Sequence, residues 1–501
     1  MLEDVRRKGL IAGRILSITI ENNIGEQATM TVPNAGIPNF VARAQVGVAS
    51  AASSDRFAET RTKRIQRRYS LREVCDFLGF PRWILNKWMD HPDAPQGIAR
   101  GRENTLSLYD VLKLRALTAG REQNAPPTLF WRKPGDPLPV VTFSSQKGGT
   151  GKSLAAAHFA QYCALQAGLR VGIIDADPQS TLSLYFADET TDVAGIDTET
   201  FTRFMGVPAP GADPLRHSDA ELDTFWVQTP WPGMRLMPGG APIQEADIAM
   251  YFMAQRKDPK ERRVYRLLKD TIDRWSAAHP PRTTAEDLCD AEGRFREDVF
   301  QEALTETLDI IVIDCAPSLT LSQLNAVVAA TTLIVPNTLR GFDLSTLRVY
   351  LSSLDDYMRF IRNEPDPVEF PPLPSYILPT NVQGNNDMDI AQVGELYAHD
   401  PEVICPIYYG HSAAVANAAR DYLSIYEYEP EKSRRRSAEL FMQNANAVGD
   451  AILTRAVPGM PSRGYANAFI AERFGDQVPP WNTDTVFAKT GTRSDDEEEV
   501  A

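Results

Sequence analysis

A glycine-rich segment flanked by two lysines is the part of this sequence best suited to chemistry on phosphate groups. Residues 147–153 read Lys-Gly-Gly-Thr-Gly-Lys-Ser. A turn rich in glycine leaves backbone N–H groups free to point at phosphate oxygens, and the N-terminus of a following helix adds partial positive charge. Lys152 would then reach the outer phosphates, and Ser153 would offer its hydroxyl to Mg²⁺. Lys147 is one basic residue more than an ordinary phosphate-binding loop needs.

Three aspartates at the ends of apolar runs could hold a metal ion or orient a water molecule. Asp175 and Asp177 follow the run at 171–174, and Asp314 closes the run at 310–313. The carboxyl ends of the strands of an open parallel sheet face its ligand crevice. An aspartate that ends an apolar strand is the Walker-B arrangement for a metal-linked carboxylate. One such aspartate alone is often a helix cap or a turn residue, but three together, at the ends of two apolar strands, predict a site.

The elements that must position these residues are indicated by apolar runs that alternate with helical ones after Pro139. The predicted strands are Val140–Phe143, Val171–Ile174, Met234–Met237, Ile310–Ile313, Thr332–Val335 and Tyr376–Leu378. Buried strands that alternate with helices imply βαβ units. The predicted fold is α/β, with a doubly wound, mainly parallel sheet over residues 139–430. Residues 255–300 are polar and charged, and we expect them to form an insertion rather than a core element.

Length and composition indicate a globular protein of more than one domain. The chain has 501 residues, of which 43% are hydrophobic and 24% are charged, and one core rarely grows that large. Its five cysteines form no C-x-x-C pair, which argues against a zinc ribbon or an iron–sulfur site and suits a reducing cytosol. We find neither a convincing signal peptide nor eighteen uninterrupted apolar residues, and therefore expect a cytoplasmic protein with no membrane partner.

The net charge of −14 hides an asymmetry along the chain. Residues 1–134 carry 21 Lys and Arg against 13 Asp and Glu, and the remaining residues carry 31 against 53. A basic N-terminal region on an acidic body suggests that contacts with nucleic acid are made mainly by the N-terminal region.

That basic region contains helix–turn–helix spacing. Ser70 and Glu73 form a capping-box signature, Gly79 ends the first predicted helix, and Pro81 opens the second. A helical hairpin whose Trp83 and Trp88 are core residues is the alternative, and we expect both tryptophans to be at least partly buried. The basic run before the first helix and the arginines after the second favour a DNA-binding domain. The side chains that we expect to contact DNA are Arg68, Arg82, Asn86, Lys87, Arg100 and Arg102.

These observations predict an order of segments along the chain. They are a partly flexible arm at 1–60, a winged helix–turn–helix domain at 61–123, a proline-rich linker at 124–138, the α/β domain at 139–430, and a helical extension with an acidic disordered tail at 431–501.

Together the motifs resemble those of the deviant Walker-A ATPases of the ParA/MinD family. The matching segments are 147–153, 175–180 and 314–317, and Asn325 and the strand at 333–336, which follow them in the sequence, match as well. The basic helix–turn–helix resembles the DNA-binding module of the larger, RepA-type plasmid-partition ParA proteins. Basic residues that family members often carry after the position of Pro406 are missing here.

The resemblance implies a role for each matching residue. ATP would lie on the loop residues Lys147, Gly148, Gly149, Thr150, Gly151, Lys152, Ser153 and Leu154, with Asn381 and Pro406 near the adenine. Lys147, Lys152 and Asp177 would be catalytic, Lys147 by reaching across a homodimer to the partner's phosphates. Ser153, Asp175 and Asp314 would support Mg²⁺.

The function implied by the resemblance is ATP-dependent DNA partition by a nucleoid-associated homodimer. A ParB-like protein bound at a centromere would stimulate a weak ATPase, and the helix–turn–helix would repress the protein's own operon. A nucleotide-switched repressor without a motor role is the alternative. The missing cysteine pair disfavours the metabolic relatives, and the acidic tail disfavours membrane cycling.

Overall fold

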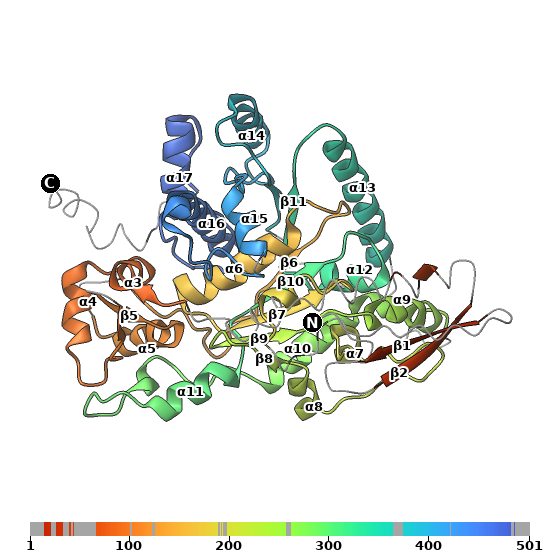
Figure 1. Cartoon of the computed structure of the whole chain (residues 1–501), viewed down its shortest axis with the longest axis horizontal. Coiled ribbons are helices and arrows are strands. Elements are labelled where there is room, and N and C mark those ends of the chain that lie inside the picture. Colours follow the sequence, from red (N-terminus) through yellow and green to blue (C-terminus); the bar gives the residue numbers. More distant parts are fainter. Residues whose placement is uncertain are drawn as a thin grey trace. The chain divides into compact units, whose positions relative to one another are not determined.

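The computed structural model contains two compact units, Met1–Arg61 and Thr62–Ala501 (Figure 1). It describes residues 15–21, 27–33, 40–41, 44, 67–100, 103–122, 126–188, 191, 193, 198–256, 262–363, 374–420, 422–481 and 485. In the first unit, strands β1 (Ile15–Glu21) and β2 (Gln27–Pro33) form an antiparallel hairpin. The sequence did not predict this hairpin, because apolar and polar residues alternate there only briefly.

A seven-stranded sheet of order β12-β11-β6-β10-β7-β9-β8 is the centre of the second unit. Its strands are β6 (Val140–Phe143), β7 (Val171–Ala176), β8 (Val227–Gln228), β9 (Met234–Met237), β10 (Ile310–Cys315), β11 (Thr332–Asn337) and β12 (Tyr376–Pro379). All neighbours pair in parallel except β8 and β9. The prediction of a doubly wound, mainly parallel sheet is confirmed, and all six predicted strands are present. The connection after β6 leads to β7 on one side of the sheet and the connection after the neighbouring strand β11 leads to β12 on the other. The glycine-rich loop after β6 therefore lies at a topological switch point.

Helices cover both faces of this sheet, and β10 shows how its side chains divide between them. Ile310 and Val312 pack in a cluster with α6 (Lys152–Ala167) and α16 (Arg435–Ala456). Ile311 and Ile313 pack in a second cluster with helices α9 (Pro242–Met253), α10 (Leu267–Ala278) and α12 (Leu321–Ala329). Successive residues of a strand point to opposite faces, so a continuous apolar run is what a doubly covered strand requires.

The prediction that residues 255–300 form an insertion outside the core is wrong for α10. Its residues Leu268, Ile272 and Trp275 are buried in the same cluster as Ile311 of the central strand. The apolar residues of α10 recur every three to four positions among charged ones, which makes the segment polar on average although one face is core.

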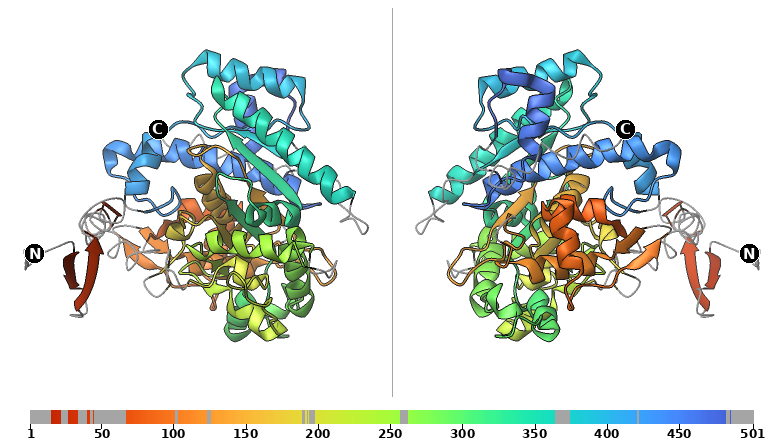
Figure 2. Two further views of the ribbon diagram at one scale, coloured as in Figure 1. Left: turned by 90° about the vertical axis from the view of Figure 1, so that its right-hand side faces the viewer. Right: turned by 90° about the vertical axis from the view of Figure 1, so that its left-hand side faces the viewer.

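The remaining helices complete the second unit. They are α7 (Phe201–Phe204), α8 (Asp219–Thr224), α11 (Glu297–Glu306), α13 (Phe342–Arg362), α14 (Asp387–His399), α15 (Ala413–Arg420) and α17 (Tyr465–Phe474). Two further views show that α9 and α13 lie on the side of the unit opposite the orange helices α3 and α4 (Figure 2). None of the helices in the described part of the chain has the length and apolar character needed to span a membrane.

Residues 67–122, called the front domain below, combine three helices with a small antiparallel sheet of order β3-β5-β4. The elements are β3 (Tyr69–Ser70), α3 (Leu71–Leu78), α4 (Arg82–Met89), β4 (Ile98–Arg100), β5 (Glu103–Leu106) and α5 (Leu108–Thr118). Ser70 and Glu73 form the predicted capping box. Gly79, with a φ of 71°, ends α3 in the left-handed conformation that glycine adopts without strain.

Two buried arginines attach the front domain to the α/β domain. Arg115 of α5 is fully buried and donates hydrogen bonds to the carbonyl oxygens of Phe77 in α3 and Leu165 in α6. Arg463 donates to the carbonyls of Asp76 and Phe77, at 3.0 and 3.1 Å. These carbonyls lie in the last turns of α3 and α6, where a helix favours positive charge. Helix α6 therefore begins at Lys152 and ends against the front domain.

Candidate functional site

The glycine-rich loop, residues 144–151, joins β6 to α6 and is open on the side where a ligand would lie. Gly149 and Gly151 have φ values of 76° and 79°, which side chains other than glycine's rarely adopt. A Cβ atom on Gly148, Gly149 or Gly151 would meet nothing within 4 Å. The N-cap of α6 is Gly151, which has no side chain that could cap the first N–H groups of the helix. The first N–H groups of α6 are thus available to an anion.

The two lysines of this segment lie in different environments. Lys152 is only 6% exposed, and its Nζ donates to the carbonyl of Lys147 at 3.3 Å. Burial lowers the pKa of Lys152, and the nearby carboxylates of Asp314 and Asp177 oppose that shift. The side chain of Lys147 is 42% exposed, and its ammonium pairs with Asp343 in the first turn of α13. Asp343 was not identified from the sequence, where it is one of many acidic residues near a helix start.

Asp175 and Asp314 are register partners on the adjacent strands β7 and β10, and both are fully buried. One oxygen of Asp175 accepts from the N–H and the hydroxyl of Ser183, at 2.7 and 2.6 Å. Burial raises the pKa of Asp175 to about 7, although the hydrogen bonds from Ser183 oppose it. Among the described residues, neither oxygen of Asp314 has a hydrogen-bond partner of good geometry. Burial, and then the charge of Asp175, raise the pKa of Asp314 well above its usual range.

Asp177 lies one residue beyond β7, in a turn against which Gly239 packs closely. Its Oδ1 accepts from the N–H of Gln179 at 2.8 Å, which fixes the orientation of the carboxylate. A Cβ atom on Gly239 would lie 2.4 Å from the carbonyl oxygen of Asp177 and 3.0 Å from Cγ of Asp175. The N–H of Gly239 donates to Ser183 Oγ at 3.0 Å. Only glycine fits this approach, and neither Gly239 nor Ser183 was identified from the sequence.

The donor set of this crevice fits Mg²⁺. The set combines the buried carboxylates of Asp175 and Asp314 with the hydroxyl of Ser153 at the start of α6, and this hydroxyl interacts with Asp314. Magnesium prefers oxygen ligands and is usually bound by one or two carboxylates together with substrate phosphates. The described residues contain no group of three or more His, Cys, Asp and Glu able to hold a metal alone. Mg²⁺ would therefore be held jointly with a phosphate on the loop.

The two residues expected near an adenine lie beyond the end of β12. Asn381 is exposed with a φ of 57°, and its Oδ1 lies 2.8 Å from Nδ1 of His411. Pro406 is buried, next to Cys405, whose N–H donates to Ile377 of β12 at 3.0 Å. Neither position is in hydrogen-bond contact with the loop, so an adenine role for them stays a prediction.

Asn325, which the resemblance also singled out, is a buried structural residue. Its Nδ2 donates to the carbonyl of Val264 at 2.6 Å, and its Oδ1 accepts from Leu268 N at 3.1 Å. It thereby fixes the start of α10 on α12.

The residues expected to contact DNA differ in whether their side chains already have partners within the front domain. Arg82 and Asn86 are exposed on α4. Lys87 pairs with Glu122 at 2.7 Å, and Arg68 donates to the carbonyl of Thr105 at 2.7 Å. Both of these basic groups are thus engaged within the fold.

Two of the residues expected to contact DNA lie wholly or partly outside the described part of the chain, and the expected burial of Trp83 is wrong. The side chain of Arg100 and all of Arg102 lie outside the described residues. Trp88 is 7% exposed, as expected, whereas Trp83 is 59% exposed and is not a core residue.

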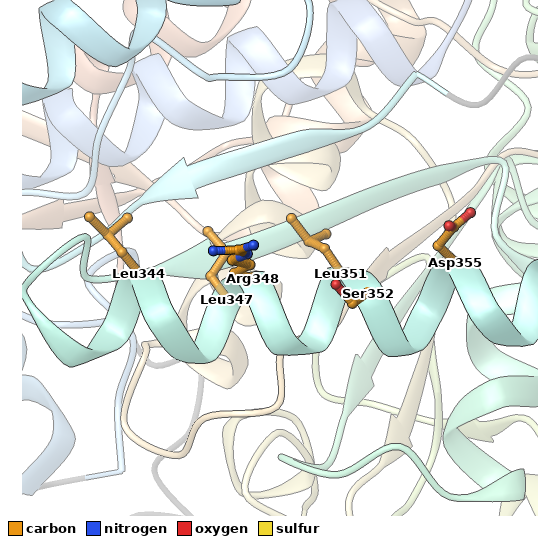
Figure 3. Close-up of a pocket in the computed structure, with 6 residues that line it drawn as sticks. All are labelled: Leu344, Leu347, Arg348, Leu351, Ser352 and Asp355. Atoms are coloured by element: carbon orange, nitrogen blue, oxygen red, sulfur yellow. The ribbon is translucent and has the colours of Figure 1, made fainter.

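A groove of about 410 Å³ runs along one side of α13. Figure 3 shows the residues that line it, Leu344, Leu347, Arg348, Leu351, Ser352 and Asp355. Although the groove begins one residue after Asp343, three of its six lining residues are leucines and none is a glycine. This lining does not suit phosphate, so the crevice at the loop remains the candidate site.

Comparison with known proteins agrees with this geometry. Residues 141–419 match the family model described as the CobQ/CobB/MinD/ParA nucleotide binding domain. The chain is 26% identical over 403 residues to "Putative replication protein A" of Sinorhizobium fredii, covering 78% of this chain and 86% of that protein. It is 24% identical over 308 residues to Protein SopA of Escherichia coli K12, covering 59% and 65%. A solved structure titled "Partition Protein" has a TM-score of 0.51 at 15% identity, covering 84% of this chain and 100% of that one.

Proposed function

Because the chain belongs to the CobQ/CobB/MinD/ParA nucleotide-binding family, we propose that it is an ATP-hydrolysing DNA-partition protein that works as a homodimer. The observation that carries the proposal is one crevice that combines a two-lysine glycine loop with Asp175, Asp177 and Asp314. Relatives named as replication or partition proteins support the partition role.

The residues of the crevice have complementary parts in ATP hydrolysis. The backbone N–H groups of the loop and the ammonium of Lys152 would bind the β- and γ-phosphates. Ser153, Asp314 and Asp175 would hold Mg²⁺, which neutralises phosphate charge when bound. Asp177, fixed by the N–H of Gln179, would orient the attacking water. Such positioning and charge neutralisation are most of what phosphoryl transfer requires.

Lys147 is proposed to act on the nucleotide of the partner protomer. Its side chain is 42% exposed, and its ammonium is bonded to Asp343 instead of turning inward beside Lys152. A side chain at the rim of the crevice is suited to cross a dimer interface once it leaves Asp343. ATP would then stabilise the dimer, because each nucleotide would be bound by both protomers.

The front domain is proposed to bind DNA as a winged helix–turn–helix. Two short helices joined by a turn and followed by an antiparallel strand pair suit this role. The ATP-bound dimer would bind DNA without sequence preference, and the front domain would bind an operator to repress the protein's own genes. A ParB-like protein at a centromere would stimulate hydrolysis and release the dimer from the nucleoid.

Measuring ATP turnover by the full chain tests this proposal. We expect slow hydrolysis with Mg²⁺ alone and a clear increase when duplex DNA and the product of an adjacent ParB-like gene are both added. A chain that binds ATP but hydrolyses none under any of these conditions would favour the other candidate, a nucleotide-switched repressor. Omitting DNA and the partner in turn shows which of them stimulates.

A further inference from the structure

Helix α4 presents a large aromatic ring to solvent. It buries Ile84, Leu85 and Trp88 against the front domain and leaves Trp83 59% exposed. An exposed tryptophan is unusual, because its large apolar surface is ordinarily covered. The same helix already buries a tryptophan, so α4 has no need of a second one for its own packing.

Trp83 shares the exposed side of α4 with two polar side chains, those of Arg82 and Asn86. Arg82, Trp83 and Asn86 are the first, second and fifth residues of α4, and they share its exposed side. Within the part of the chain that the structure describes, none of the three side chains has a hydrogen-bond, ion-pair or ring partner. Lys87 differs, because Glu122 holds its ammonium at 2.7 Å and also accepts from Trp88 Nε1 at 3.1 Å.

The chemistry of this face fits the major groove of DNA better than a protein surface. A guanidinium and an amide lie on the same exposed side of α4 as the ring, in an N-terminal region (residues 1–134) with 21 basic against 13 acidic residues. In the major groove, arginine pairs with guanine and asparagine with adenine, while apolar side chains contact the methyl group of thymine. The N-terminal residues of a recognition helix are those that reach base edges.

We propose that Trp83 determines sequence preference by packing against the 5-methyl group of a thymine in the operator. This inference rests on the proposed DNA-binding function and adds to it the residue and the base group that it recognises. Asn86, one turn further along, would bind an adenine in the same site, and Arg82 a guanine. The front domain holds these three residues in place, because Arg115 and Arg463 bind carbonyl oxygens at the end of α3, where the turn into α4 begins.

Deoxyuridine, which is thymine without the methyl group, tests the proposal directly. Binding sites would be selected from random duplexes with the full chain, and each thymine then replaced singly by deoxyuridine. At one position we expect the parent to bind about tenfold more weakly. Trp83→Ala should bind the thymine duplex about tenfold more weakly, with no further loss on deoxyuridine, because the two changes remove one contact. Trp83→Phe should retain part of the preference.

Controls separate this inference from the proposed function. Tyr251→Ala, which removes an equally exposed ring from α9, should leave DNA binding unchanged, and Trp83→Ala should keep the parent's melting temperature. Equal binding to thymine and deoxyuridine at every position would overturn the inference while leaving sequence-specific binding intact. Failure to select any duplex would overturn the proposed operator binding by the front domain. A Trp83→Ala protein that loses self-association and keeps DNA affinity would show that this face docks protein.

Discussion

The ammonium of Lys147 and the carboxylate of Asp343 form an ion pair that joins the glycine-rich loop to the first turn of α13. Asp343 is the more buried partner, with 11% of its side chain exposed, and it also accepts from the hydroxyl of Thr338. Lys147 is therefore held within its own protomer. Any role for this lysine on a partner's nucleotide requires that the pair open first.

Replacing Asp343 with asparagine should favour the ATP-bound dimer. The amide keeps the shape of the side chain but loses the charge that retains Lys147. A pair with one partly exposed partner is worth about 1 kcal/mol or less, and two such pairs open in the homodimer, so we expect dimerisation up to about thirtyfold tighter. Sedimentation velocity with a non-hydrolysable ATP analogue measures this. Asp355→Asn, which removes a pair with Arg359 on the same helix, is the matched control. Unchanged or weaker dimerisation of Asp343→Asn would show that the pair does not oppose the dimer.

Gly239→Ala should disturb the turn that holds Asp177 at the end of β7. The new Cβ would lie 2.4 Å from the carbonyl oxygen of Asp177, and that backbone can move only by shifting Asp175 as well. Overpacking of this kind costs about 1–3 kcal/mol, so we expect a lower melting temperature and an ATP turnover reduced more than about tenfold.

Gly384→Ala is the control for that substitution, because the nearest atoms to its Cβ are side-chain ends at 3.8 Å. It should behave like the parent. A Gly239→Ala protein with the parent's stability and turnover would mean that the turn tolerates the displacement.

His158 should make the protein less stable as the pH falls below 6.5. It is buried in α6, its Nε2 accepts from Ile425 N at 3.3 Å, and burial lowers its pKa to about 3. A folded-state pKa below the unfolded value gives stability that is present above pH 6.5 and is lost as the pH falls toward 3. From these two values the loss between pH 7.5 and 5 is about 2 kcal/mol.

Denaturant unfolding at both pH values measures that loss in the parent and in His158→Gln. Glutamine keeps an acceptor but does not titrate, so its decrease between pH 7.5 and 5 should be about 2 kcal/mol smaller. His411→Gln, at an exposed position, should match the parent. Parallel decreases in all three proteins would mean that His158 titrates normally in the fold.

The sheet and the loop could be predicted because their signals are local. β7 and β10 are continuous apolar runs that end in aspartates, and Lys147–Ser153 carries its phosphate chemistry in seven consecutive residues. Parallel strands then bring Asp175 and Asp314 together from 139 residues apart, as their register pairing confirms.

The partners of the site residues could not be predicted, because long stretches of sequence separate these partners from the residues that they contact. Asp343 and Gly239 have no local pattern that distinguishes them, and only the folded chain brings them to Lys147 and Asp177. The exposure of Trp83 was missed for another reason. With two tryptophans five positions apart on one short helix, the sequence did not show which face of α4 is buried.

The central claim, that Lys147 completes the site of a partner protomer, is tested most directly by Lys147→Ala. Nucleotide affinity and steady-state ATP turnover would be measured on the same preparation with Mg²⁺ and duplex DNA. We predict nucleotide binding within about threefold of the parent and a turnover reduced by about 100-fold or more, because a charge that stabilises the transition state is lost. A turnover within twofold of the parent would contradict the account.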